Sequence, residues 1–84
     1  MSKFPIVEVI WTDACASDNS WTPLDDLIED NTVANCTTVG YLTKDTETEV
    51  QVIQSVCGSE GGEAMSIPRG CVTKVRRLNE VVSI

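Results

Sequence analysis

The sequence predicts a mainly β fold, a small five-stranded barrel with one short helix between its first and second strands. Segments rich in β-branched residues recur along the chain and are separated by short turns that contain Gly, Pro, Asp or Thr. Only residues 23–30 show the three- and four-residue apolar spacing that is typical of a helix. A chain of 84 residues is too short for a stable open sandwich, whereas a closed barrel leaves few strand edges exposed.

The first strand is predicted at residues 6–11, which alternate between two faces. Val7, Val9 and Trp11 fall on one face, and Glu8 falls on the other. We therefore expect Trp11 to face the core. Residues 12–20 are small and polar, a composition typical of a surface loop whose Asp and Asn side chains bond back to the backbone.

A helix start is predicted immediately after this loop. The Thr22 hydroxyl can accept bonds from free backbone N–H groups of the first turn, and Pro23 suits the first helical position. The Asp25 side chain can in turn accept a bond from the backbone N–H of the capping residue. Glu29 and Asp30 oppose the helix dipole at the far end, so we expect the helix to stop early.

The apolar positions of this helix predict one buried stripe. Leu24, Leu27 and Ile28 follow the i, i+3, i+4 spacing, which favours a face packed on the core. Trp21 precedes the helix and allows two interpretations. It either staples the helix entry against Leu27 or Ile28, or it stays available for a ligand.

From residue 35 onward the sequence predicts strands. Gly40 lies within one of them and indicates a bulge or sharp bend. Val72, Val75 and Leu78 are three residues apart, which requires either a bulge or a partly helical segment. The predicted strands cover residues 36–42, 48–56, 63–67 and 71–78, with a polar turn at 43–47, a hairpin tip at 58–62 and a tight turn at 68–70.

The end of the chain carries a resemblance to a known barrel class. The run Ile67-Pro68-Arg69-Gly70, followed by Val72 and Val75, resembles the strand, one-turn 3₁₀ helix and strand that end an SH3-like (Sm-like) barrel. The resemblance implies that fold and carries no function.

Composition limits the possible functions. The chain is predicted to form a single domain, residues 1–84, with thirteen Asp and Glu against six Lys and Arg and a formal charge of −7. Such an acidic chain is repelled by phosphate backbones, so generic nucleic-acid binding is not expected. No targeting segment or membrane span is recognised, and the expected location is the cytoplasm.

The residue types favour a protein that is not an enzyme and that needs no cofactor. His is absent, which removes the commonest general base and zinc ligand, and the Gly-rich segment 58–62 lacks the Lys of a phosphate-binding loop. The four cysteines are widely spaced, so we expect small buried or free thiols and no metal site. They are Cys15, Cys36, Cys57 and Cys71.

Two surfaces are candidates for binding. The first would hold a small anionic or nucleotide-like ligand between indole rings and guanidinium groups. Its candidate residues are Trp11, Asp13, Trp21, Arg69, Arg76 and Arg77. The basic residues among them also fit a solvated edge strand that its charges protect from aggregation. The second surface is the acidic side of the helix, formed by Asp25, Asp26, Glu29 and Asp30, which would meet a basic protein.

The order of several segments resembles a family of small, largely uncharacterised proteins of tailed bacteriophages. These segments are residues 9–13, Trp21 before an acidic helix, residues 38–42, residues 65–72 and residues 75–78. The resemblance implies a viral protein in the cytoplasm of an infected bacterium, with a non-enzymatic accessory role, and it transfers no site residues. We expect a host–virus interaction in which the chain inhibits or redirects a host or phage protein. The alternative is an anti-defence oligomer that sequesters a nucleotide-type signal, and in either case we expect a homo-oligomer.

Overall fold

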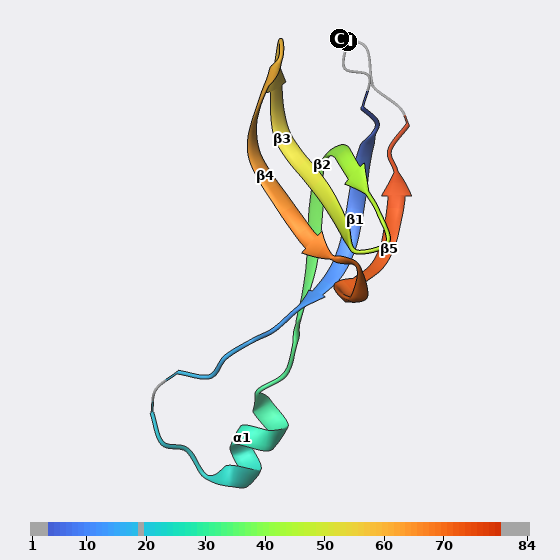
Figure 1. Cartoon of the computed structure of the whole chain (residues 1–84). Coiled ribbons are helices and arrows are strands. Elements are labelled where there is room, and N and C mark those ends of the chain that lie inside the picture. Colours follow the sequence, from blue (N-terminus) through green and yellow to red (C-terminus); the bar gives the residue numbers. More distant parts are fainter. Residues whose placement is uncertain (1–3, 19, 80–84) are drawn as a thin grey trace.

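The computed structural model describes residues 4–18 and 20–79, in which five antiparallel strands form one sheet (Figure 1). The strands are β1 (Ile6–Asp13), β2 (Ala34–Asp45), β3 (Glu49–Cys57), β4 (Glu60–Pro68) and β5 (Val72–Arg77). Helix α1 (Leu24–Asp30) lies between β1 and β2, and a single 3₁₀ turn, η1 (Arg69–Cys71), joins β4 to β5. The predicted mainly β class and the position of the helix are therefore confirmed.

The sheet is open, so the predicted closed barrel is not confirmed. The strand order is β4-β3-β2-β1-β5, which leaves β4 and β5 as two edges that do not pair with each other. The sheet nevertheless curls, because Ile67 of β4 is buried in the same cluster as Val9 of β1, and Val75 of β5 packs against that cluster. Two edge strands thus share one core without being joined by backbone hydrogen bonds.

The core consists of branched aliphatic side chains on the concave face. Val9 and Val50 are completely buried, and each such side chain contributes on the order of 1.5–3 kcal/mol through removal of apolar surface from water. The predicted alternation of β1 is confirmed, since Val7 and Val9 are buried while Trp11 packs partly buried against the same cluster. The buried set is Val7, Val9, Val50, Val52 and Ile67.

The three-residue spacing in β5 is explained by a bulge. Lys74 lies opposite Ile10 but Val72 lies opposite Trp11, so the register shifts between those two residues of β1. The shift turns both Val72 and Val75 toward the core. The bulge that the spacing predicted is therefore confirmed, whereas Leu78 remains exposed.

Gly40 serves a different purpose from the predicted bulge. The irregularity of β2 lies further on, between Leu42 and Lys44, so the prediction of a bulge at Gly40 is wrong. A Cβ atom at Gly40 would approach the backbone oxygen of Ile53 to 2.8 Å. Glycine is needed here because the neighbouring strand passes too close for any side chain.

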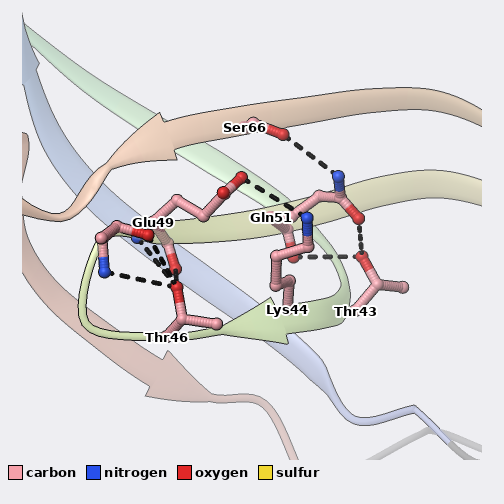
Figure 2. A network of polar contacts seen from close by, with 7 residues as sticks. Thr43, Lys44, Thr46, Glu49, Gln51 and Ser66 are labelled. Carbon is pink, nitrogen blue, oxygen red and sulfur yellow. Dashed lines mark hydrogen bonds and ion pairs between the residues drawn. The ribbon is translucent and has the colours of Figure 1, made fainter.

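The turn between β2 and β3 is organised by Thr46 (Figure 2). Its Oγ1 accepts hydrogen bonds from the backbone N–H groups of Thr48 at 3.3 Å and Glu49 at 3.1 Å. Beside the turn, the Gln51 side chain accepts a bond from Thr43 at 2.9 Å and donates one to Ser66 at 3.1 Å. These side-chain bonds link β2, β3 and β4 across the sheet.

Three strands, β1, β2 and β4, are longer than predicted, whereas β3 has its predicted length and β5 is shorter. β1 continues to Asp13 and β2 starts at Ala34, and these two residues form the last pair between the strands. The hairpin between β3 and β4 turns through Gly58, which has a φ of 60°. The extra pairs at the end of β1 and β2 form a narrow ribbon, and this ribbon holds the helical segment away from the core (Figure 1).

Candidate functional site

Residues 14–33, called the arm below, leave the sheet between β1 and β2 and carry α1 (Figure 1). Every described residue from 13 to 33 is exposed, and α1 buries none of its side chains. The Cα radius of gyration is 17.0 Å and the longest extent is 54 Å. A compact chain of this length has a radius of gyration of about 12 Å. The arm therefore projects from the sheet and does not fold back onto it.

Short-range hydrogen bonds hold the arm together. The Leu27 N–H donates to the carbonyl of Pro23 at 3.0 Å, and the Asn31 N–H donates to the carbonyl of Leu27 at 3.1 Å. The Asn31 side chain donates to the carbonyl of Cys15 at 3.1 Å, which joins the end of α1 to the start of the arm. A helix of one or two turns is only marginally stable alone, and this bond adds a contact between its end and the preceding loop.

The predicted cap of α1 is wrong. The helix begins at Leu24, and Pro23, with a φ of −52° and a ψ of 135°, takes the N-cap position that was expected for Thr22. No side chain bonds to the free amides of the first turn. Asp25 in that turn remains favourably placed, because a carboxylate near a helix N-terminus complements the dipole.

The apolar stripe of α1 is exposed, which corrects the prediction of a buried face. Leu24 is 68% exposed and Ile28 is 69% exposed, while Leu27, which lines the hollow beside the loop, is 37% exposed. Trp21 is 101% exposed, so the predicted staple against Leu27 or Ile28 is wrong. These side chains have the correct helical spacing for one face, but the ribbon keeps that face away from the core of its own sheet.

The arm is uniformly acidic. It carries five carboxylates and no Lys or Arg, since the first basic residue after Lys3 is Lys44. A hollow of about 210 Å³ lies between the loop and α1, and three carboxylates line it together with Leu27. The five carboxylates are Asp18, Asp25, Asp26, Glu29 and Asp30. An exposed apolar stripe surrounded by negative charge is typical of a surface that docks on a basic protein.

One carboxylate of the arm has a perturbed pKa. The Ser20 hydroxyl and then the Ser20 backbone N–H donate to Asp18 Oδ1, and these bonds lower the pKa of Asp18 below its ordinary value of 3.8. Both bonds favour the charged form of the carboxyl group. Asp18 therefore keeps its charge to lower pH than an isolated Asp would.

Trp11 and Asp13 of the predicted ligand set have local partners. The Trp11 indole lies against the core, and its Nε1–H donates to Oγ1 of Thr38 at 2.9 Å. Asp13 is exposed at the end of β1, where its Oδ1 accepts a bond from the Ala14 N–H at 2.9 Å. Trp11 thus packs partly buried against the core of the sheet, while Trp21 is exposed on the arm.

Arg69 connects η1 to the turn between β2 and β3. Its Nε and Nη2 both donate to the backbone carbonyl of Thr46, at 3.0 Å and 2.8 Å, and its Nη2 also contacts Asp45. The Arg69 N–H donates to the carbonyl of Thr48 at 2.9 Å. The planar guanidinium is therefore used within the fold, as a clamp between two turns.

The basic residues of β5 lie on both faces of that edge strand. Arg76 pairs with Glu8 at 3.1 Å, opposite it on β1. Arg77 lies opposite Val7, whose side chain is in the core, so Arg76 and Arg77 point to opposite faces. Lys74 shares the face of Arg76 because the two residues alternate along β5.

The predicted ligand residues therefore lie in separate parts of the fold. Trp21 is on the arm, Arg69 is at the turn of η1, and Trp11 is in the wall of the sheet. Arg76 and Arg77 are adjacent in the chain but not on one face. The four carboxylates predicted to bind a partner do lie together, all on α1 with the exposed apolar stripe.

Other functional groups are sparse among the described residues. Within residues 4–18 and 20–79, no group of His, Cys, Asp and Glu is placed to hold a metal ion. All four thiols are free, and Cys15 and Cys57 are exposed, so the expectation of burial is wrong for these two. No helix in the described part of the chain is both long and apolar enough to cross a membrane.

A second exposed apolar surface was not predicted from the sequence. Ile6, Val39 and Leu78 are exposed on the sheet, and the register brings them together. The alternation of β1 already placed Ile6 and Val7 on opposite faces of the sheet, but only the pairing of β1 with its neighbours showed which residues surround Ile6.

No family model, curated protein or solved structure matches this chain.

Proposed function

We propose that this chain is a non-enzymatic binding protein that docks its arm on a basic, partly apolar surface of another protein and thereby inhibits or redirects it. The observation that carries the proposal is the exposure of Trp21, Leu24 and Ile28 on a projecting acidic arm. Soluble proteins rarely leave neighbouring large apolar side chains in water unless a partner covers them.

The size and shape of the arm suit this role. Tryptophan is among the side chains that contribute most at protein interfaces, and Trp21 is completely accessible. The spacing of Leu24, Leu27 and Ile28 matches the anchors of an amphipathic helix that lies in a groove. Each anchor that enters a pocket gains roughly 1.5–3 kcal/mol from burial, before the costs of association are subtracted.

The charge of the arm defines the partner. Five carboxylates without a basic residue favour a groove bordered by Lys and Arg, and their field accelerates encounter with such a surface at low salt. The resemblance to small phage proteins suggests that the partner is a host or phage protein in an infected bacterium.

Sequestration of a nucleotide-type signal is the less supported alternative. It requires indole and guanidinium groups around one pocket. Trp11 is bonded to Thr38, and Arg69 is bonded to the turn at Thr46, so neither side chain is free to close on a ligand without breaking these bonds.

A crosslinking experiment tests the proposed function. A photoreactive amino acid is placed at position 21 of the full chain, and in a matched control at Ser59 on the hairpin tip. In a bacterial lysate, we expect an adduct with a protein other than this chain itself, and from position 21 only. The adduct should be lost with Leu24→Ser/Ile28→Ser, and it should weaken with Asp25→Asn/Asp30→Asn.

The captured protein is then identified by mass spectrometry, purified and titrated with the chain. We expect binding that weakens as salt is raised, because charge attraction contributes. Equal adducts from positions 21 and 59, or an adduct that survives both arm variants, would contradict the proposed function.

A further inference from the structure

Three of the four large apolar side chains that the structure describes as exposed outside the arm lie near the basic edge of the sheet, whereas the fourth, Met65, lies on β4 at the other edge. Ile6 and Val39 are both on the convex face, since Ile6 alternates with buried Val7 and Val39 lies opposite Glu8. Leu78 lies beside Ile6, because its N–H donates to the carbonyl of Ile6 at 2.9 Å. We call Ile6, Val39 and Leu78 the sheet patch.

Positive charge borders the sheet patch. Arg76 lies opposite Glu8 on the same face and is half-exposed while it pairs with that carboxylate at 3.1 Å. Lys74 lies opposite Ile10, one step further along this face, and it is exposed without an ion-pair partner among the described residues. Glu8 lies among the residues of the sheet patch and offsets the charge of Arg76, so Lys74 supplies the net positive charge at this border, whereas the arm is apolar with a negative border.

We propose that the arm of one chain docks on the sheet patch of a second copy of the same chain. This inference rests on the proposed function, because it assigns a partner to the same arm. The stripe of Leu24, Leu27 and Ile28 would cover Ile6, Val39 and Leu78, and carboxylates that border the stripe would lie toward Lys74 and Arg76 on β5. Exchange of two arms between two chains closes a dimer with twofold symmetry.

The dimensions of the two surfaces agree. A seven-residue helix is about 10 Å long, and the sheet patch runs from Leu78 across Ile6 to Val39, which is two strand spacings or about 10 Å. The arm projects away from its own sheet, along an extent of 54 Å against 27 and 23 Å in the other directions (Figure 1). A second copy can therefore supply the positive charge and the apolar surface that the arm does not contact within its own chain.

Self-association also regulates the arm in this arrangement. While a second copy covers Leu24 and Ile28, another protein has to displace it before it can bind. Because the whole chain carries a charge of −7, two copies repel each other at long range, and the contact depends on the local match of charges. Salt weakens both effects, so a test by charge exchange is sharper than a test by ionic strength.

The experiment is sedimentation velocity of the full chain with two charge variants. The arm variant is Asp25→Lys/Asp30→Lys, in which one change disfavours and the other favours the helix dipole. The patch variant is Lys74→Glu/Arg76→Gln, in which glutamine can still bond to Glu8. We expect the wild type to dimerise. Each variant alone should dimerise at least about tenfold more weakly, which corresponds to a loss of ~1.4 kcal/mol or more in the free energy of association.

An equal mixture of the two variants is the decisive sample. Both contacts of a mixed dimer pair opposite charges again, so we expect the mixture to regain association that neither variant shows alone. Circular dichroism checks that both variants fold, and Met65→Ser, an exposed apolar change outside both surfaces, should leave the dimer unchanged.

Three outcomes would overturn the inference: a wild type that stays monomeric at every concentration, a mixture that remains monomeric, or a dimer that both variants retain. None of these outcomes changes the result expected for the crosslink from position 21 to another protein. Conversely, a charge-exchangeable dimer without an adduct to any other protein would limit the docking role of the arm to a second copy of the chain and contradict inhibition of another protein.

Discussion

The guanidinium of Arg69 donates twice to the backbone carbonyl of Thr46, from Nε at 3.0 Å and from Nη2 at 2.8 Å. This contact joins η1, which leads into the last strand, to the turn between β2 and β3. It holds one edge strand near the middle of the sheet and so supports the curl that closes over Val9 and Ile67.

Arg69→Ala should therefore destabilise the fold. Hydrogen bonds from a charged donor contribute roughly 1.5–3 kcal/mol, and the pair with Asp45 adds little because both side chains are more than a third exposed. We expect a loss of about 1–2 kcal/mol in the free energy of unfolding, measured with urea. Lys at this position should restore only part of it, since an ammonium cannot form the same fork. Arg77→Ala is the control, and an equal loss there would contradict the clamp.

Gly40→Ala should strongly destabilise the chain. Among the glycines without a positive φ, Gly40 has the closest contact with a neighbouring backbone atom. Its Cβ would meet the Ile53 oxygen at 2.8 Å, and forced displacement of a neighbouring strand costs about 1–3 kcal/mol. Gly70→Ala is the matched control, because nothing lies within 4 Å of its Cβ position. Thermal unfolding of both variants measures the difference, and similar midpoints would show that the strands do not approach so closely.

The arm should contribute almost nothing to the stability of the folded chain. Trp21→Ser and Ile28→Ser remove side chains that are already in water, so the free energy of unfolding should change by less than about 0.5 kcal/mol. The comparison is Ile67→Ala, which empties a buried site and should cost about 2–5 kcal/mol. Urea unfolding is measured at low protein concentration, where self-association is absent. A large loss from Trp21→Ser would mean that the arm packs on its own sheet.

The carboxyl of Asp18 should titrate below its ordinary pKa of 3.8 because Ser20 donates two bonds to the charged form. A group with a lowered pKa in the folded state stabilises local order above its unfolded pKa, and this effect is lost as pH falls through the lowered value. NMR titration of the Asp18 side chain measures the midpoint. Ser20→Ala should raise the pKa toward 3.8, since it removes the first of the two bonds. An unchanged midpoint in that variant would show that Ser20 does not hold the carboxylate.

Local sequence patterns were sufficient for the elements of the sheet. The alternation of Val7, Glu8 and Val9 predicted which face of β1 is buried, because side chains of a strand alternate strictly. The spacing of Val72 and Val75 allowed either a bulge or a partly helical segment, and the pairing of β5 with β1 shows that it is a bulge. Strand ends were less predictable. The ribbon consists of residues 12–13 paired with residues 34–35, and its polar residues are extended only because the partner strand is present.

The strands, the short helix, the absence of His and the uneven distribution of charge could all be recognised in the sequence. The open sheet, the bonding of Arg69 within the fold and the exposure of Leu24, Leu27 and Ile28 depend on contacts that no local pattern shows. The physical reason is that helical spacing is a local property, identical for a face buried in its own core and for a face left to a partner. Which of the two occurs depends on where the paired ribbon of β1 and β2 directs the arm, and that direction is set by contacts far apart in the sequence.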